Sequence, residues 1–452
     1  MSTTEDNRVA PPADLRDERL ATPRDIADHV RAGVRRVRDG DLGALPVIAG
    51  IVVIWTIFQV LNPTFLSSTN LVNLSFDMVP IGVIALGIVC VLLVGQIDLS
   101  VGSVSGLSGA ITAVVMVRFE QPTWLAVLAA LAASCLIGWL YGQGFNRIGV
   151  PSFVVTLAGL LAFLGVQLLV LQGENAINLP FDSTLVKFAQ LWFVPDWLAY
   201  TLAVAAGMGF SAAGWVRART RRRAGLSAQS PQWLVAKSVL LLAALLFMVS
   251  YLCRTRGVAW MFVLFVALVL ALNYVLTRTK YGRSVYAVGG NAEAARRAGI
   301  NVRRVYTSVF VICSGLAALG GVLAASRLAA ANQSAGGGDV NLNAIAAAVI
   351  GGTSLFGGRG SAFAALLGTL VIQSISSGLT LLNLDSSYRF VITGLVLFIA
   401  VGLDAVARRS RQAHGRGETD DGVARRNRSY DRPQAPYQAV KPPSMVRLAP
   451  VM

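Results

Sequence analysis

The chain has 452 residues, of which 55% are apolar and only 14% are charged, and its formal net charge is +16. Soluble domains carry about 25% charged residues, so this composition excludes an ordinary soluble domain. The apolar residues also gather in blocks of about 18 or more, the length that spans a membrane. Most arginines lie at the ends of those blocks, and the sequence contains no RNA- or DNA-binding motif. We therefore attribute the positive charge to membrane topology and lipid contact, not to nucleic-acid binding.

Residues 1–43 are polar and precede the first apolar block, which predicts a cytoplasmic tail and no cleavable signal peptide. Within this tail, residues 25–38 are compatible with an amphipathic surface helix or with disorder. Residues 407–452 are polar and contain proline, so we expect a second cytoplasmic tail that is disordered. Residues 44–406 predict an all-α, polytopic transmembrane domain with twelve candidate spans: 44–63, 71–95, 99–117, 123–145, 152–172, 196–216, 233–253, 257–277, 304–326, 341–357, 361–382 and 388–406.

The distribution of lysine and arginine among the loops predicts that both termini are cytoplasmic. With the N-terminus inside, the inside segments hold the larger basic groups: Arg31, Arg35, Arg36 and Arg38; Arg147; Arg217, Arg219, Arg221, Arg222 and Arg223; the loop 278–304; and Arg408, Arg409 and Arg411. The outside loops hold Arg118, Lys187, Arg254, Arg256, Arg327 and Arg389. Arg254 and Arg256 count against this orientation, but the asymmetry as a whole requires an even number of spans.

The first motif that could carry function is GQIDLSVG at residues 95–102, between the second and third spans. A charged side chain at mid-membrane costs about 2.5–3.5 kcal/mol on insertion scales, so Asp98 should face a cavity or a partner. Gly95 and Gly102 allow the backbone to turn or unwind there. Two compatible interpretations remain open: Asp98 caps the third span by accepting backbone N–H bonds, or it lines the transport pathway.

Other polar or small residues in the spans have structural explanations. Gly102, Gly106 and Gly109 have the spacing that lets two membrane helices approach closely, and we interpret them as packing residues. The four cysteines lie in or at the ends of apolar blocks without a CxxC pair, and the two histidines lie in the tails. We therefore expect no metal site, no cofactor and no histidine-based active site.

The stretch 279–303 is too polar to span a membrane and lies inside according to the charge distribution. Its core predicts a short helix, with Asn291 as the N-cap, Glu293 in the first turn and Gly299 at the C-terminal stop. A short helix on an intracellular loop is suited to docking a partner protein. The alternative interpretation is an ordinary connecting loop.

In the stretch 336–360, glycines flank a short apolar helix, which is typical of a discontinuous membrane segment near a transport pathway. The tenth span is therefore expected to be broken or re-entrant. No lysine follows a glycine anywhere in the chain, so the phosphate-binding motif GxxxxGK[ST] is absent. The energy for transport must come from another polypeptide or from an ion gradient.

Three long motifs, GQIDLSVGSV, YAVGGNAEAARRAGINV and NAIAAAVIGGTSLFGGRGS, together resemble the ribose/xylose permease family of bacterial ABC importers, in the same order and over residues 44–406. The phrase VPSFVVTLAGLL and the extra spans within 196–253 make the chain most similar to the xylose-type permeases. The sequence departs from the family where many relatives have an acidic residue at Asn341 or Asn343, and where GGID or GEID is commoner than GQID. These departures bear on which sugar is carried.

The resemblance implies a dimeric permease in the bacterial inner membrane, surrounded by lipid, which binds two cytoplasmic ABC ATPases and receives sugar from a periplasmic or lipid-anchored binding protein. ATP hydrolysis belongs to the ATPase subunits, so this chain is expected not to be an enzyme. The residues expected to couple to the ATPase are Arg283, Asn291, Glu293, Ala294, Ala295 and Gly299. The residues expected along the translocation pathway are Gln96, Asp98, Ser100, Asn341, Asn343, Thr353 and Ser354.

The resulting prediction is a permease that moves a monosaccharide, a pentose such as xylose, by alternating access. Three alternatives stay open. The first is an ABC permease for another small solute, such as an amino acid or an autoinducer. The second is an ion-coupled transporter, for which Asp77 and Asp98 are the candidate coupling carboxylates. The third is a membrane enzyme, although no nucleophile, base and metal ligands converge in the sequence.

Overall fold

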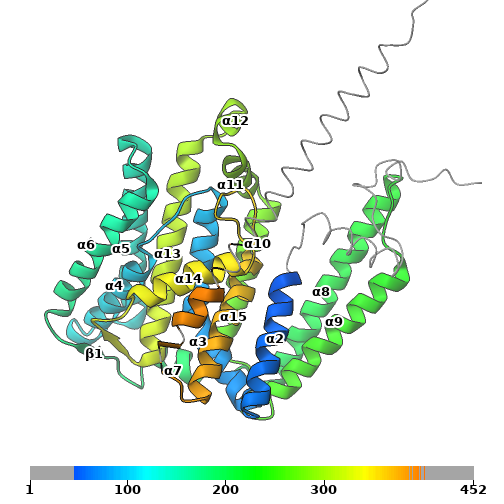
Figure 1. Ribbon diagram of the computed structural model, residues 1–452, viewed down its shortest axis with the longest axis horizontal. Coiled ribbons are helices and arrows are strands. Elements are labelled where there is room, and N and C mark those ends of the chain that lie inside the picture. Colours follow the sequence, from blue (N-terminus) through cyan, green and yellow to red (C-terminus); the bar gives the residue numbers. More distant parts are fainter. Residues whose placement is uncertain (1–44, 386, 389, 397, 399–401, 403–452) are drawn as a thin grey trace, which may run out of the picture. The chain divides into compact units, whose positions relative to one another are not determined.

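The computed structural model describes residues 45–385, 387–388, 390–396, 398 and 402, and this part of the chain is almost entirely helical (Figure 1). Nine of its helices, two of them with a π-helical last turn, are long and apolar enough to cross a membrane. They are α3 (Ser68–Leu93), α4 (Val101–Ala113, extended by Val114–Arg118), α5 (Thr123–Gln143, extended by Gly144–Ile148), α6 (Ser152–Leu171), α8 (Asp196–Arg223), α9 (Pro231–Leu252), α10 (Trp260–Arg278), α13 (Val302–Leu328) and α15 (Ala362–Leu381). Two shorter apolar helices are α2 (Leu45–Leu61) and α14 (Gly338–Ile350).

The first eleven predicted spans each coincide with one of these helices, which confirms the all-α polytopic fold. The tenth, α14, has only 13 residues and is followed by irregular backbone at 351–361, so the prediction of a broken segment is also confirmed. Of the twelfth span, 388–406, the described residues 388, 390–396, 398 and 402 are all helical, and the others lie outside the described residues. Both polar tails lie outside the described residues.

Four elements were not predicted from the sequence. The short helix α7 (Thr184–Gln190) precedes α8, and the strands β1 (Ala176–Asn178) and β2 (Ala330–Asn332) pair antiparallel. In the predicted intracellular loop, α11 (Lys280–Gly290) precedes the predicted short helix, which is α12 (Ala292–Arg297).

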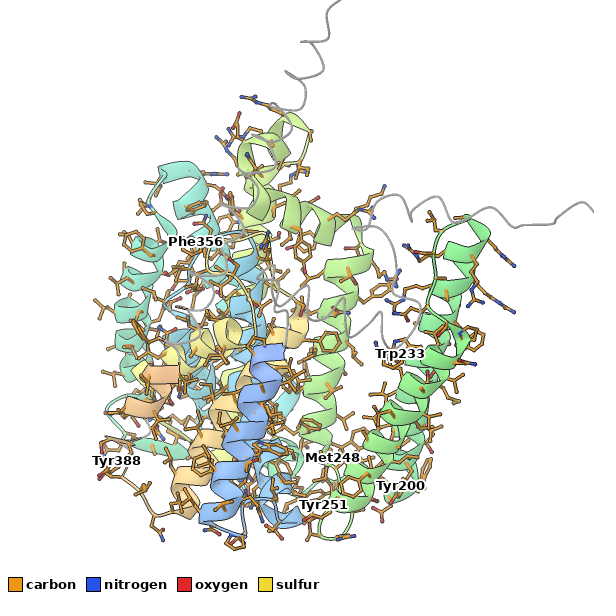
Figure 2. The ribbon with its side chains drawn as sticks, turned by 45° about the vertical axis from the view of Figure 1, so that its right-hand side comes forward. Tyr200, Trp233, Met248, Tyr251, Phe356 and Tyr388 are labelled. Atoms are coloured by element: carbon orange, nitrogen blue, oxygen red, sulfur yellow. The ribbon has the colours of Figure 1, made fainter. Side chains whose placement is uncertain are left out.

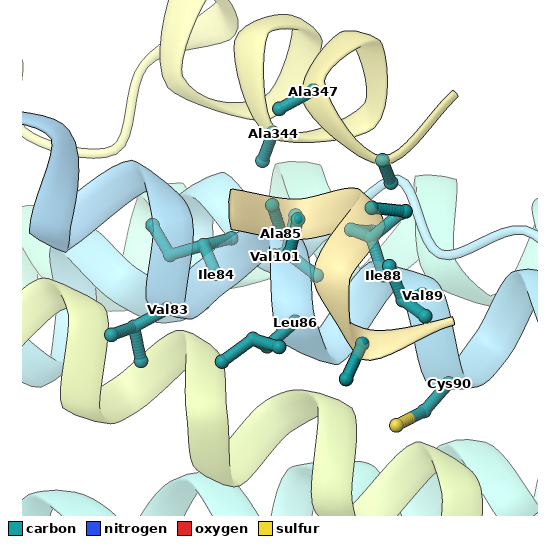
Figure 3. Packing of buried hydrophobic residues seen from close by; sticks show 14 of the residues in the cluster. Val83, Ile84, Ala85, Leu86, Ile88, Val89, Cys90, Val101, Ala344 and Ala347 are labelled. Atoms are coloured by element: carbon teal, nitrogen blue, oxygen red, sulfur yellow. The ribbon is translucent and has the colours of Figure 1, made fainter. Parts of the chain in front are cut away.

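Helix α3 lies at the centre of the packed part of the protein, with 89% of its most apolar window buried. Its side chains, among them Ile84, Leu86 and Ile88, belong to one continuous apolar cluster that also includes Ala344 and Ala347 of α14 (Figure 3). Small residues allow close helix packing here: a Cβ at Gly138 of α5 would lie 2.5 Å from the Phe310 carbonyl oxygen of α13. The core therefore depends on backbone proximity as much as on large apolar side chains.

Polar contacts at one end of the helices connect residues that the charge distribution assigned to the outside. Arg118 forms an ion pair with Glu174 at 2.7 Å, and Arg327 forms one with Asp77 at 3.1 Å. At the opposite end, Asn146 donates to the main-chain oxygen of Arg303 at 2.9 Å. The contacts therefore group these helix ends into two sets, and which set faces the cytoplasm stays a prediction.

Helices α8 and α9 form a hairpin that packs chiefly against itself. Only 17% of the most apolar window of α8 and 6% of that of α9 are buried. The hairpin is attached to α3 near one end, where the Tyr251 hydroxyl donates to the Leu66 carbonyl at 2.9 Å and the Ser68 hydroxyl to the Leu252 carbonyl at 3.3 Å. Figure 2 shows Tyr251 at this end and Trp233 towards the other. The exposed apolar sides of the hairpin are suited to lipid.

Candidate functional site

Asp98 lies in the irregular turn between α3 and α4 and is only 1% exposed. Its Oδ1 atom accepts hydrogen bonds from the Ser100 backbone N–H at 2.8 Å and from the Ser100 hydroxyl at 2.7 Å. This bond to the residue two positions ahead forms an Asx turn that leads the chain into α4. The backbone N–H that bonds to Asp98 belongs to Ser100, the residue just before α4.

The second carboxylate oxygen, Oδ2, is buried and has no oxygen or nitrogen hydrogen-bond partner among the described residues, although the buried Cys313 thiol of α13 interacts with this carboxylate. A buried polar atom without a partner costs free energy, so such atoms are rare and often functional. The Oδ1 bonds shape the turn before α4 but do not cap the helix, because the N-cap residue is Ser100 and no side chain bonds to the first N–H groups of α4. The pathway role of Asp98, with which the unpartnered Oδ2 agrees, stays a prediction.

The turn that contains Asp98 is held between α6 and α14. The Leu99 N–H donates to the Thr156 hydroxyl of α6 at 3.1 Å, and the Asn341 side-chain amide of α14 donates to the Leu99 carbonyl at 2.7 Å. A Cβ at Gly102 would lie 2.6 Å from the Gly336 carbonyl oxygen. Gly102 therefore allows the start of α4 to contact the irregular backbone before α14. The predicted close approach of a second helix occurs at Gly109, where a Cβ would lie 3.3 Å from the Ala325 Cβ of α13.

The predicted pathway residues divide into two groups. Asp98, Ser100 and Asn341 are buried around the turn, and Thr353 and Ser354 are buried in the loop after α14. The Asn341 Oδ1 and Thr353 Oγ1 atoms have no hydrogen-bond partner among the described residues. The remaining two predicted residues, Gln96 and Asn343, are half-buried.

Gln167 was not predicted, but it occupies a comparable position on α6. It is fully buried, and its side-chain amide donates to the carbonyls of Asn332 and Ala335, both at 3.0 Å. Its Oε1 atom has no partner among the described residues. Gln167 thus holds the segment that joins β2 to α14. A single glutamine in an otherwise apolar span was the sequence signal that could have identified it.

A cavity of about 70 Å³ lies beside this segment, lined by residues of α3, α4 and α13 and by residues 330–340. Small-molecule sites have volumes of about 300–1,000 Å³, so this cavity is too small for such a ligand. We refer to the boundary between the start of α4 and α14 as the seam. A Cβ at Gly102 would contact Asn341, and a Cβ at Gly106 would contact the Gln167 Oε1 atom, so these two side chains lie against the start of α4. Their unpartnered oxygens are acceptors for hydroxyl groups.

The predicted coupling helix is present as α12. The Asn291 Oδ1 atom accepts a hydrogen bond from the Ala294 N–H at 2.9 Å, and Gly299 has a φ of 83°, so the predicted cap and stop are both confirmed. Glu293 forms ion pairs with Arg296 at 3.1 Å and Arg297 at 3.4 Å within the helix. Of the predicted coupling residues only Ala295 is buried; the exposed ones are Arg283, Asn291, Glu293, Ala294 and Gly299. Their role in coupling stays a prediction.

Helix α11 attaches α12 to the transmembrane helices. Val285 and Val288 are buried, the Tyr281 hydroxyl is 2.9 Å from the Ser308 hydroxyl of α13, and the Tyr286 hydroxyl donates to the Gly360 carbonyl at 2.8 Å. Burial raises the pKa of Tyr281 to about 12, so this phenol is neutral at physiological pH. The exposed helix α12 is thus connected to both α13 and the loop after α14.

Within the described part of the chain, no group of three or more His, Cys, Asp or Glu side chains is placed to hold a metal ion. The site described above consists of buried hydrogen-bonding groups and an exposed helix, without a cluster of catalytic side chains.

Residues 70–401 match the model of a family described as "Branched-chain amino acid transport system / permease component". The chain belongs to this permease family. It is 34% identical over 379 residues to the xylose transport system permease protein XylH of Escherichia coli, covering 83% of this chain and 95% of the relative. The corresponding protein of Haemophilus influenzae is 32% identical over 82% of this chain and 98% of its own. The ribose import permease protein RbsC of Escherichia coli is 31% identical over 79% of this chain and 92% of its own. No solved structure matches.

Proposed function

We propose that this protein is the transmembrane permease subunit of an ATP-driven importer that moves a monosaccharide, a pentose such as xylose, by alternating access. The observation that carries this proposal is the 34% identity to a xylose permease, which extends over 95% of that relative. The family match extends over residues 70–401, so both functional segments described above lie within it.

The chemistry of the buried seam favours a sugar over an amino acid. A zwitterionic amino acid needs groups of both charges, but Asp98 is the one charged side chain that is buried among the described residues. The unpartnered oxygens of Asp98, Asn341, Gln167 and Thr353 instead offer hydrogen-bond acceptors. Sugar hydroxyl groups can donate to such acceptors when the seam opens.

The proposed partners rest on the similarity to the sugar import permeases, and the ATPase site rests also on the exposure of α12. Two cytoplasmic ATPases hydrolyse ATP and dock on α12, whose Asn291, Glu293 and Ala294 are exposed. A periplasmic or lipid-anchored binding protein delivers the sugar, and a second permease copy completes the transmembrane unit. This chain itself supplies no catalytic residue.

We place the permease in the bacterial inner membrane with both termini cytoplasmic. Membrane lipid covers the α8–α9 hairpin, where Val239 is 60% and Leu240 is 73% exposed. The exposed Arg217, Arg219 and Arg222 at the end of α8 lie where anionic headgroups would meet them.

Reconstitution in proteoliposomes tests this proposal. The permease, its ATPase and its binding protein would be combined, and uptake of labelled xylose measured with and without ATP. Uptake that needs ATP and all three proteins supports the proposal. Uptake by this chain alone under an ion gradient would indicate a secondary transporter, and competition by leucine but not by ribose would indicate an amino-acid permease.

A further inference from the structure

Three segments that are far apart in the sequence meet through their backbones at the end of α3. The Gly358 N–H donates to the Leu93 carbonyl at 2.9 Å. A Cβ at Gly289 would overlap the same Leu93 carbonyl oxygen and would lie 2.7 Å from the Gly358 nitrogen. We refer to Leu93, Gly289 and Gly358 as the backbone clasp.

Each member of the backbone clasp belongs to a different functional element. Gly289 lies in the last turn of α11, two residues before the Asn291 cap of α12. Leu93 is the last residue of α3 and directly precedes the turn that contains Asp98. Gly358 lies in the irregular loop that joins α14 to α15. The clasp therefore connects the exposed helix α12 to the turn that leads into α4 and to the loop that follows α14.

The local geometry makes this connection rigid. Gly357 and Gly358 have φ values of 84° and 72°, a left-handed conformation that glycine adopts readily and other residues resist. The Tyr286 hydroxyl adds a second connection by donating to the Gly360 carbonyl at 2.8 Å. Because backbone atoms contact each other without intervening side chains, a displacement of α11 is passed on and not absorbed by rotamer changes.

We propose that the backbone clasp is the joint through which movement of α12 reaches the Asp98 turn and α14. This inference rests on the proposed importer function, in which an ATPase moves α12. When α12 moves, Gly289 displaces the end of α3 and the 351–360 loop together. Both walls of the seam, the start of α4 and α14, are connected to this joint through short segments, so its displacement acts on the seam from both sides.

The test compares two neighbouring glycines of α11. A Cβ at Gly289 enters the clasp, whereas a Cβ at Gly290 has no heavy atom within 4 Å. Gly289→Ala and Gly290→Ala therefore change helix propensity alike but differ in this contact. In proteoliposomes with the ATPase and binding protein, we expect Gly289→Ala to lower the sugar transported per ATP hydrolysed about tenfold, within the range for residues that couple two sites. Gly290→Ala should stay close to wild type, and both should still co-purify with the ATPase.

Tyr286→Phe provides a milder variant in case Gly289→Ala does not insert. It removes only the hydroxyl bond to Gly360, and we expect the sugar-to-ATP ratio to fall about two- to threefold. A wild-type ratio of sugar transported to ATP hydrolysed in Gly289→Ala would refute the proposal. If Gly289→Ala does not insert, a wild-type ratio in Tyr286→Phe would refute it. Loss of ATPase co-purification in Gly289→Ala would also overturn it, because the clasp would then act in docking. A wild-type complex without ATP-driven uptake would instead overturn the importer function itself.

Discussion

Replacing Asp98 separates its contribution to folding from its contribution to transport. In Asp98→Ala the Ser100 N–H and hydroxyl lose their shared acceptor, and Ser100 is fully buried. Each such bond contributes about 0.5–1.5 kcal/mol net, so the two together contribute about 1–3 kcal/mol to stability. Asp98→Asn retains an oxygen at the Oδ1 position and should cost about 1 kcal/mol or less.

We expect the transport defect of Asp98→Ala to exceed what this loss of stability explains. A carboxyl at this depth, with Oδ2 unpartnered, should act on the pathway or its gating in addition to shaping the turn. Uptake per inserted permease should therefore fall about tenfold or more in the alanine variant, a difference of about 1.4 kcal/mol or more. The asparagine variant should recover most of the stability but only part of the uptake.

The assay combines thermal melting of the purified permease with sugar uptake at matched amounts of inserted protein. Asp77→Ala is the control, because Asp77 is about half exposed and its ion pair with Arg327 contributes about 0–1 kcal/mol. Normal expression of Asp98→Ala together with wild-type uptake would refute the reasoning. Reduced expression with normal uptake per molecule would leave Asp98 only its role in shaping the turn before α4.

Further substitutions test the coupling helix, the topology and the core. Gly299 has a φ of 83°, and a Cβ there would have open space around it, so Gly299→Val should strain only the backbone, by about 1 kcal/mol or more. Gly299→Val and Glu293→Lys should each abolish sugar uptake and ATPase co-purification in a permease that still inserts. Normal values for both variants would make α12 a simple connector. A cysteine at Ala224 should be labelled by an impermeant reagent only from the cytoplasmic side, and labelling in intact cells would contradict the topology. Gly138→Val should lower the melting temperature strongly, because its Cβ would lie 2.5 Å from the Phe310 carbonyl, and an unchanged melting temperature would argue against the α5–α13 packing.

Local sequence features alone predicted the membrane helices and the ends of α12. Apolar blocks encode spans because lipid requires every backbone group to be satisfied within a helix. Asn291 and Gly299 act on neighbouring backbone groups, so their effect can be predicted without tertiary contacts. Glycines around 336–360 similarly predicted a broken segment. The helix α11 was missed because its pattern is short and contains three glycines.

Only the tertiary structure decided which polar groups meet. Asn341 bonds to Leu99 across 242 positions, and Gln167 bonds to Asn332 across 165 positions. The sequence predicted that Asp98 and Asn341 matter, but not that they lie at one turn, and it gave no reason to connect Gln167 with α14. Gly289 and Gly358 belong to two separate sequence motifs, and only the structure shows that both contact Leu93. Periodicity and capping describe interactions over a few residues, whereas these contacts depend on how whole helices pack, and packing is determined by the shapes of all the surfaces together.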